Sequence, residues 1–139
     1  MIFSEELQIV TKHQGLLEIT RKVRDAVTNS CVQNGLCTVF VRHTSASLII
    51  QENADPSAKR DLEYFLNKLI PENDSGFTHT FEGPDDMPSH IKAALTQTSV
   101  VIPVVSGEMT LGTWQGIYLW EHRASPHSRT IVVHCMGED

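Results

Sequence analysis

Apolar residues recur at every second position in several short stretches, which is the period of a half-buried β-strand. The clearest alternation, within residues 36–43, places four side chains on one face: Cys37, Val39, Val41 and His43. This pattern, or a short apolar run, predicts strands over residues 2–12, 16–19, 36–43, 45–51, 100–105, 117–123 and 129–135.

Other stretches carry apolar residues at the three-to-four-residue spacing of an amphipathic helix. The first begins near residue 19 and ends near Asn34-Gly35, a good helix stop. A second starts at Asp55-Pro56, with Asp as N-cap and Pro at the first position, and ends at Pro71. After the loop-like residues 72–84, a short helix is expected over residues 88–95.

The predicted strands outnumber the helices, and the helices do not alternate regularly with them. This order favours an α+β fold, with a mainly antiparallel sheet packed with two to three helices, over a doubly wound fold. We expect the last two strands to pair through Ser125-Pro126, and Pro103 to hold its strand at a sheet edge or a bulge. No repeat or linker interrupts residues 1–139, so one domain is expected.

Composition narrows the class of protein. Apolar residues make up 40% and charged residues 20% of the chain, which is ordinary for a folded domain. The net charge of −6 argues against non-specific binding to nucleic acid or to an anionic membrane surface. No apolar run approaches the ~20 residues of a membrane helix, and the acidic start lacks signal-peptide features. We therefore expect a cytoplasmic protein whose three cysteines are reduced, buried packing residues: Cys31, Cys37 and Cys135.

His43 ends a strand whose other residues on that face are apolar, so its side chain is expected to point inward. Ser45 and Ser47 share its parity and would add two hydroxyl groups to one row. A buried histidine hydrogen-bonded to the backbone is the plainer alternative. The two serines favour a ligand-binding role over that alternative.

Asp86 and His90 are four residues apart, which places them on one helical face about one turn apart. They could ligate a metal, or the carboxylate could orient the ring as an acid–base pair. The alternative is that Asp86 only caps the helix, with Pro88 just inside it. His79 lies in the preceding polar loop, where a histidine is usually only solvated, so it ranks below His43 and His90.

The segment Gly112-Thr113-Trp114-Gln115-Gly116 suits a backbone that closely approaches a ligand or another subunit. Gln115 supplies a two-sided amide, Trp114 a flat apolar wall, and Thr113 a hydroxyl group. Asn53 precedes a capped helix and could reach the same cavity. The alternative is a tight turn with a core tryptophan.

Near the end of the chain, Glu121 and His122 have opposite parity on one strand, so only one of them can face a given cavity. The sequence leaves that choice open and favours a structural pairing of Glu121 with Arg129 or Arg123. Arg129 or Lys92 could instead add positive charge beside a phosphorylated substrate.

Acids and histidines outnumber bases among these candidates, which suits a divalent metal better than direct phosphate capture. The candidate ligands are His43, Asp86 and His90. Histidine favours zinc or another transition metal, whereas carboxylates and phosphate favour magnesium, so the identity stays open. No phosphate-binding loop, dinucleotide fingerprint or nucleophile elbow occurs in the sequence.

Several segments together resemble the YjbQ family (UPF0047) over nearly the whole chain. The most diagnostic is residues 106–117, Ser-Gly-Glu-Met-Thr-Leu-Gly-Thr-Trp-Gln-Gly-Ile. Residues 43–48, 52–56 and 82–92 are similar to the other family signatures, and Glu121-His122-Arg123 with Arg129 complete the pattern.

The resemblance implies a compact α+β domain, a homotrimer, and a weak, secondary thiamine-phosphate synthase activity. That reaction joins a pyrimidine diphosphate to a thiazole phosphate and releases pyrophosphate. The enzyme hypothesis assigns catalysis to His43, Asp86, His90 and Gln115, with a divalent metal. Substrate-binding residues would be Ser45, Ser47, Asn53, Thr113 and Arg129. The alternatives are a trimeric module that binds a metal or small anion without turnover, and a purely structural trimer.

Overall fold

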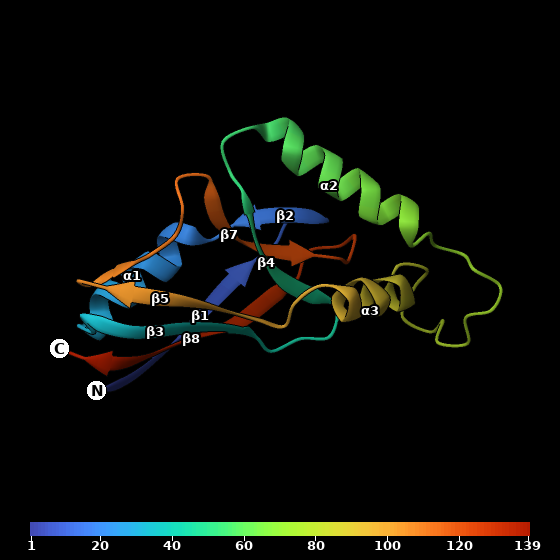
Figure 1. Ribbon diagram of the computed structural model, residues 1–139. Helices are drawn as coiled ribbons and strands as arrows, with labels where there is room; N and C mark the ends of the chain where they lie inside the picture. Colours follow the sequence, from blue (N-terminus) through green and yellow to red (C-terminus); the bar gives the residue numbers. More distant parts are fainter.

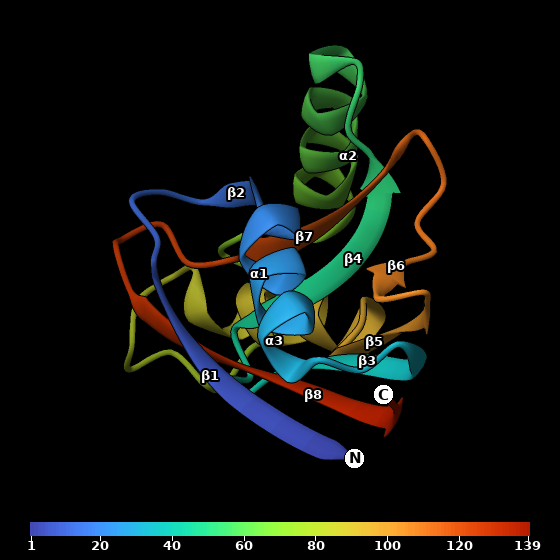
Figure 2. The same cartoon turned by 90° about the vertical axis from the view of Figure 1, so that its left-hand side faces the viewer.

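Two antiparallel sheets face one another across the core in the computed structural model, which describes all residues 1–139 (Figures 1 and 2). The larger sheet has the order β1 (Ile2–Val10), β8 (Ser128–Glu138), β3 (Asn34–Val41), β5 (Ser99–Val105) and β6 (Glu108–Met109). The smaller sheet has the order β2 (Gly15–Glu18), β7 (Gln115–Glu121) and β4 (Ala46–Glu52). All pairs are antiparallel, which confirms the α+β prediction.

The helices cover different parts of this sandwich. Helix α1 (Thr20–Ser30) closes one end of the space between the sheets, as Figure 2 shows. Helix α2 (Pro56–Leu69) lies along the outer side of the smaller sheet, and α3 (Asp86–Leu95) lies at the end opposite α1 (Figure 1). The chain between α2 and α3 forms a long loop without strands or helices, as expected.

Local chemistry explains where the helices begin and end. The Asp55 carboxylate accepts a hydrogen bond of 2.9 Å from the backbone N–H of Ser57, and Pro56 occupies the first position of α2. Helix α3 begins at Asp86, two residues earlier than predicted. Helix α1 ends at Ser30 and is capped by Cys31, whose φ of 61° lies in the left-handed region.

The main core combines the inner faces of both sheets with the buried side of α1. Its fully buried members include Val23, Val39, Leu48, Leu119 and Val133. A smaller cluster joins α2 to the outer face of the smaller sheet through Leu66, Ile70, Tyr118 and Trp120. Only Leu66 within α2 is buried, while the predicted stripe residues Phe65 and Leu69 are exposed.

The last two strands were expected to pair, and this prediction is wrong. β7 pairs with β2 and β4 in the smaller sheet, whereas β8 pairs with β1 and β3 in the larger one. The segment between them, which contains Ser125-Pro126, therefore crosses from one sheet to the other. Alternation predicts strands but does not specify their partners.

Pro103 lies near a sheet edge, as its missing N–H requires. β5 pairs with β3 along its length, and on the other side only with the two-residue β6, a strand that the sequence did not predict. The carbonyl of Pro103 accepts hydrogen bonds from Thr110.

All three cysteines are free, as predicted, but they differ in exposure. Cys37 and Cys135 are buried and face each other in register on β3 and β8, and burial raises the pKa of the Cys37 thiol. Cys31 is exposed, contrary to prediction, because it ends α1 rather than packing inside a strand. No helix of the structure is both long enough and apolar enough to span a membrane.

Candidate metal centre

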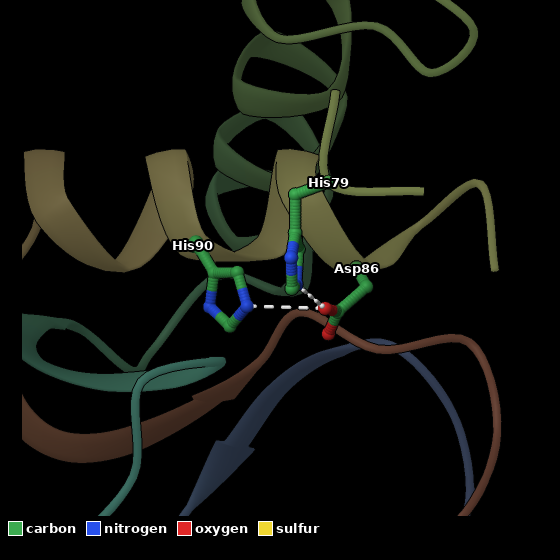
Figure 3. A group of neighbouring side chains, drawn as sticks. All are labelled: His79, Asp86 and His90. Carbon is green, nitrogen blue, oxygen red and sulfur yellow. Dashed lines mark hydrogen bonds and ion pairs between the residues drawn. The ribbon is translucent and has the colours of Figure 1, made fainter. Parts of the chain in front are cut away.

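Two imidazole rings converge on one carboxylate oxygen at the start of α3 (Figure 3). The Asp86 Oδ2 atom lies 2.7 Å from His79 Nε2 and 3.1 Å from His90 Nε2. The ring centroids of the two histidines are 5.3 Å apart. The three potential ligand atoms all lie within 4.8 Å of one another, which makes this group the clearest candidate for a metal site.

The fold holds these three side chains in different ways. Asp86 and His90 lie one turn apart on α3, as their spacing predicts. His79 reaches the same point from the loop before the helix. Gly83, with φ of 104°, adopts a conformation that side chains disfavour and reverses the chain between His79 and Asp86.

Asp86 is fully buried beneath the two rings and stays ionised because cationic and hydrogen-bonding groups surround it. Burial alone would raise the pKa of Asp86. The hydrogen bond from His79 and the charges of His90 and Arg123 outweigh that effect and hold the pKa below its usual value. Arg123 lies 3.0 Å from Asp86 Oδ1, on the side away from the histidines.

The hydrogen bonds of His90 fix which nitrogen faces the carboxylate. His90 Nδ1 lies 2.8 Å from the carbonyl oxygen of Thr44, and a carbonyl only accepts, so Nδ1 carries the proton. In the neutral ring Nε2 is then a lone pair aimed at Asp86 Oδ2. A proton on Nε2 or a cation must lie between these two acceptors.

The cluster is open to solvent on one side. The His79 side chain is 47% exposed and the His90 side chain 28% exposed, while that of Asp86 is 2% exposed. A hollow of about 270 Å³ opens beside His79 and is lined also by Phe77 and Met87. A bound ion would therefore keep coordination positions free for water or a substrate.

The structure does not bring His43 to this cluster, although it was a candidate ligand with Asp86 and His90. His43 Nε2 accepts a hydrogen bond of 2.8 Å from the backbone N–H of Thr130. Burial, followed by the charge of Arg129, lowers its pKa. His43 is half-buried and bonded to the backbone, which is close to the plainer alternative for it, and His79 lies beside Asp86 and His90 in its place.

The expected row of His43, Ser45 and Ser47 does not form, because the chain bends after β3 and resumes at β4. Ser45 Oγ accepts from Arg129, at 3.0 Å. Ser47 Oγ lies 2.8 Å from His122 Nε2 and accepts from Thr96 at 2.6 Å. Both serines are buried, so neither is placed to touch a substrate.

Arg129 is buried as well and forms an ion pair with Glu121, one of the two pairings that the sequence favoured. Thr11 donates a hydrogen bond of 2.7 Å to the same carboxylate. Burial alone would raise the pKa of Glu121, but the hydrogen bonds from Arg129 and Thr11 lower it. Arg129 therefore joins two strands and is not free to bind phosphate.

His122 is also buried, so Glu121 and His122 both lie inside the protein, at the point where the chain leaves β7. Its Nδ1 atom is the one buried side-chain nitrogen or oxygen without a hydrogen-bond partner. Burial, followed by the charge of Lys92, lowers the pKa of His122 to about 3. His122 is thus neutral in the folded protein at neutral pH.

We expect acidification to destabilise the metal-free protein through His122. The folded pKa of about 3 lies below the unfolded value of 6.5, so the unfolded state binds one more proton between these pH values. This proton lowers the free energy of unfolding by about 1.4 kcal/mol per pH unit as the pH falls through that window. Urea unfolding of wild type and His122→Asn at pH 6.5, 5.5 and 4.5, with a chelator present, measures the slope.

In the His122→Asn variant, the free energy of unfolding should depend less steeply on pH between 6.5 and 4.5. The difference should correspond to nearly one proton fewer taken up on unfolding. The residual slope would come from His43 and, toward pH 4.5, from buried carboxyl groups such as Glu121, whose pKa values are also lowered, and His43→Asn serves as a second variant. Parallel curves for wild type and His122→Asn would contradict the assignment.

Asn53, Thr113 and Gln115 lie together at the other end of the protein. They line a hollow of about 470 Å³ beside α1, far from the loop that carries His79 (Figure 1). Gln115 Oε1 accepts a hydrogen bond of 2.8 Å from the backbone N–H of Gly112, so it shapes its own loop. Trp114 is 62% exposed rather than a core residue.

The residues that the sequence assigned to one site thus lie in separate parts of the structure. Asp86 and His90 join His79; Asn53, Thr113 and Gln115 line the hollow beside α1; His43, Ser45, Ser47 and Arg129 make hydrogen bonds within the protein. His79 ranked below His43 in the sequence because no periodicity places a loop residue, yet it is His79 that lies beside Asp86 and His90. Its proximity to an acid-rich helix start was the available signal.

Comparisons with known proteins agree with this fold. The family model described as UPF0047 protein YjbQ-like matches residues 5–138. A UPF0047 protein of Synechocystis sp. is 54% identical over 134 residues, covering 96% of this chain and 91% of the relative. The YjbQ protein of Escherichia coli O157:H7 is 40% identical over 139 residues, covering 99% of this chain and all of the relative (100%).

Solved structures extend the likeness to three dimensions. A YbjQ-like protein of unknown function from Sulfolobus solfataricus superimposes with a TM-score of 0.91 at 27% identity, covering 99% of each chain. A YjbQ/UPF0047 protein from Clostridium acetobutylicum gives a TM-score of 0.88 at 37% identity, covering 95% of this chain and 99% of the other. The chain therefore belongs to the UPF0047 family of YjbQ-like proteins.

Proposed function

We propose that this protein binds a divalent transition metal, zinc first, through His79, Asp86 and His90, and uses it to act on a small phosphorylated molecule. The observation that carries the proposal is the convergence of two ring nitrogens on one buried carboxylate oxygen, at 2.7 and 3.1 Å. Two histidines and one carboxylate, with positions left open, are typical of catalytic zinc sites. Imidazole ligands favour zinc over magnesium.

The surroundings of the cluster support a metal. A ligating histidine commonly donates its second ring N–H to a carbonyl, and His90 does so to Thr44. Arg123 binds the oxygen of Asp86 that points away from the rings, so Oδ2 stays directed at them. A metal bound here would polarise a phosphoryl or pyrophosphoryl oxygen.

The specific reaction that we propose is the one implied by the family resemblance, the formation of thiamine phosphate from a pyrimidine diphosphate and a thiazole phosphate. The metal would stabilise the departing pyrophosphate, and the protein would supply positioning rather than a covalent nucleophile. We propose a homotrimer as the working form, with exposed Phe65 and Leu69 on α2 available for contacts between copies.

Metal content tests the proposal. We expect near-stoichiometric zinc or another transition metal in protein purified without chelator, measured by elemental analysis. His79→Ala and His90→Ala should lose it. His43→Ala is the matched control, since His43 is bonded to the backbone of Thr130, and it should keep the metal. An equal loss in His43→Ala, or no metal even after incubation with zinc, would overturn the site.

The synthase reaction is then tested with the metal-loaded protein, in the oligomeric state that gel filtration shows. We expect thiamine phosphate and pyrophosphate to form, and both to disappear with the metal in His90→Ala. Stoichiometric metal without product would leave the metal site standing and refute the synthase reaction. That outcome corresponds to a module that binds without turnover.

A further inference from the structure

The hollow beside α1 presents unpaired positive charge to a cavity. Its volume is about 470 Å³, and Arg21 and Arg24 line one wall. The two residues lie three positions apart on α1, so their side chains project from the same face. Neither guanidinium forms an ion pair or a hydrogen bond within the chain, in a protein of net charge −6.

The start of α1 adds to this positive character. Ile19 occupies the N-cap position, no side chain caps the helix, and its first turn contains no acid. The first backbone N–H groups of α1 are therefore left without a capping side chain, and the one nearby carboxylate, Glu18, bonds to the hydroxyl of Thr20 instead. Thr20, the first residue of α1, lines the hollow together with the two arginines.

Another part of the lining offers hydrogen-bond donors. Thr113 and Gln115 form it, and because Gln115 Oε1 is held by the N–H of Gly112, its amide nitrogen is left free to donate. Gly116 lets the wall pack closely, since a Cβ there would lie 2.6 Å from Glu18 Oε2 and 3.0 Å from Asn53. The glycines of this segment thus serve close approach.

Glu18 is the one acid in the lining, and its carboxylate is already hydrogen-bonded within the chain. Its Oε2 atom accepts from Thr20 at 2.7 Å and from Asn53 at 3.1 Å. The lining therefore keeps an excess of positive charge, with two arginines against one glutamate. Arg24 also lines an adjoining hollow of about 400 Å³, which leaves room for a ligand larger than a free phosphate.

We infer that this hollow is a second ligand site, separate from the metal cluster, which binds the phosphate group of a small molecule between Arg21, Arg24 and the Thr113–Gln115 wall. Two guanidinium groups and neutral donors in one lining suit a phosphate, which accepts several charge-assisted hydrogen bonds at once. The overall negative charge of the protein disfavours a nucleic-acid backbone as the occupant. The site needs no metal.

Calorimetric titration with inorganic phosphate and with pyrophosphate tests this inference. The titrations use metal-free Asp86→Asn protein with chelator, so that binding through the metal cluster contributes nothing, at constant ionic strength. We expect Arg21→Gln and Arg24→Gln each to raise the Kd for phosphate by roughly ten- to hundredfold. This is the loss in affinity that corresponds to one hydrogen bond to a charged group. Pyrophosphate should bind more tightly than phosphate.

Lys22→Gln is the matched control, because it removes the same charge from the same helix turn at a position that does not line the hollow. It should change the Kd less than about threefold, since exposed charges are largely screened. If Lys22→Gln weakens phosphate binding as much as the arginine variants do, the effect comes from the overall charge of the helix, and the site is overturned. Absence of binding to the metal-free protein, with binding only after zinc is added to wild type, would also overturn it while leaving the metal proposal intact.

Discussion

Replacing Arg129 by methionine is expected to lower the free energy of unfolding by about 3–5 kcal/mol, the usual cost of breaking a buried ion pair. Arg129 is 3% exposed and Glu121 1% exposed, so the carboxylate would remain inside the protein without its cation. Thr11 and the backbone N–H of Arg123 would still donate to Glu121, but neutral donors do not neutralise a buried charge. Urea unfolding near pH 7 measures the loss.

The double variant Glu121→Leu/Arg129→Met is the control for this prediction. It removes both charges, and an apolar pair in place of a buried ion pair is often neutral or stabilising. We expect it to be more stable than Arg129→Met alone. If Arg129→Met costs less than about 1 kcal/mol, as an exposed pair would, the pair does not have the buried role that the structure gives it.

Replacing Asp86 by asparagine is expected to raise the Kd for zinc by at least about 100-fold. Loss of an outer-shell partner of a metal ligand already costs 10–100-fold, and Asp86 is placed to be a ligand itself. Both histidines point at its Oδ2 atom, so the variant removes the charge that draws the ion between them. Competition with a chromophoric chelator at fixed pH gives the affinity.

The neighbouring acid provides the comparison. Asp85 accepts hydrogen bonds from Arg123 Nε at 3.0 Å and from the N–H of Ala124 at 2.8 Å, and it contacts neither histidine. Asp85→Asn should therefore change zinc affinity by less than about tenfold, although it weakens the anchor of α3. Comparable losses in both variants would mean that the ion responds to net charge and not to a ligand.

Much of the fold could be predicted from the sequence because its signals are local. Alternation located β3 and β4 to within a few residues, and Asp55-Pro56 placed the start of α2. The pattern could not predict which strands pair with one another. β7 and β8 follow each other in the chain but enter different sheets, and only the packing of both sheets on one core decides this.

The candidate site was predictable to the extent that helical spacing brought its residues together. Asp86 and His90 lie side by side because four residues make about one helical turn. His79 could not be placed, because a loop brings it back from seven residues earlier. His43 does not lie with Asp86 and His90, because its strand ends two residues before it and the chain then bends. Strand parity therefore no longer predicts the direction of its side chain.

Three consecutive side chains at the end of β7 reach three different parts of the protein. Glu121 binds Arg129 on β8, His122 bonds Ser47 on β4, and Arg123 holds Asp85 and Asp86 at the start of α3. Such a junction couples local opening events: neither sheet can separate from the other without releasing the same short segment. Amide protons of both sheets should therefore exchange with solvent deuterium through one shared opening.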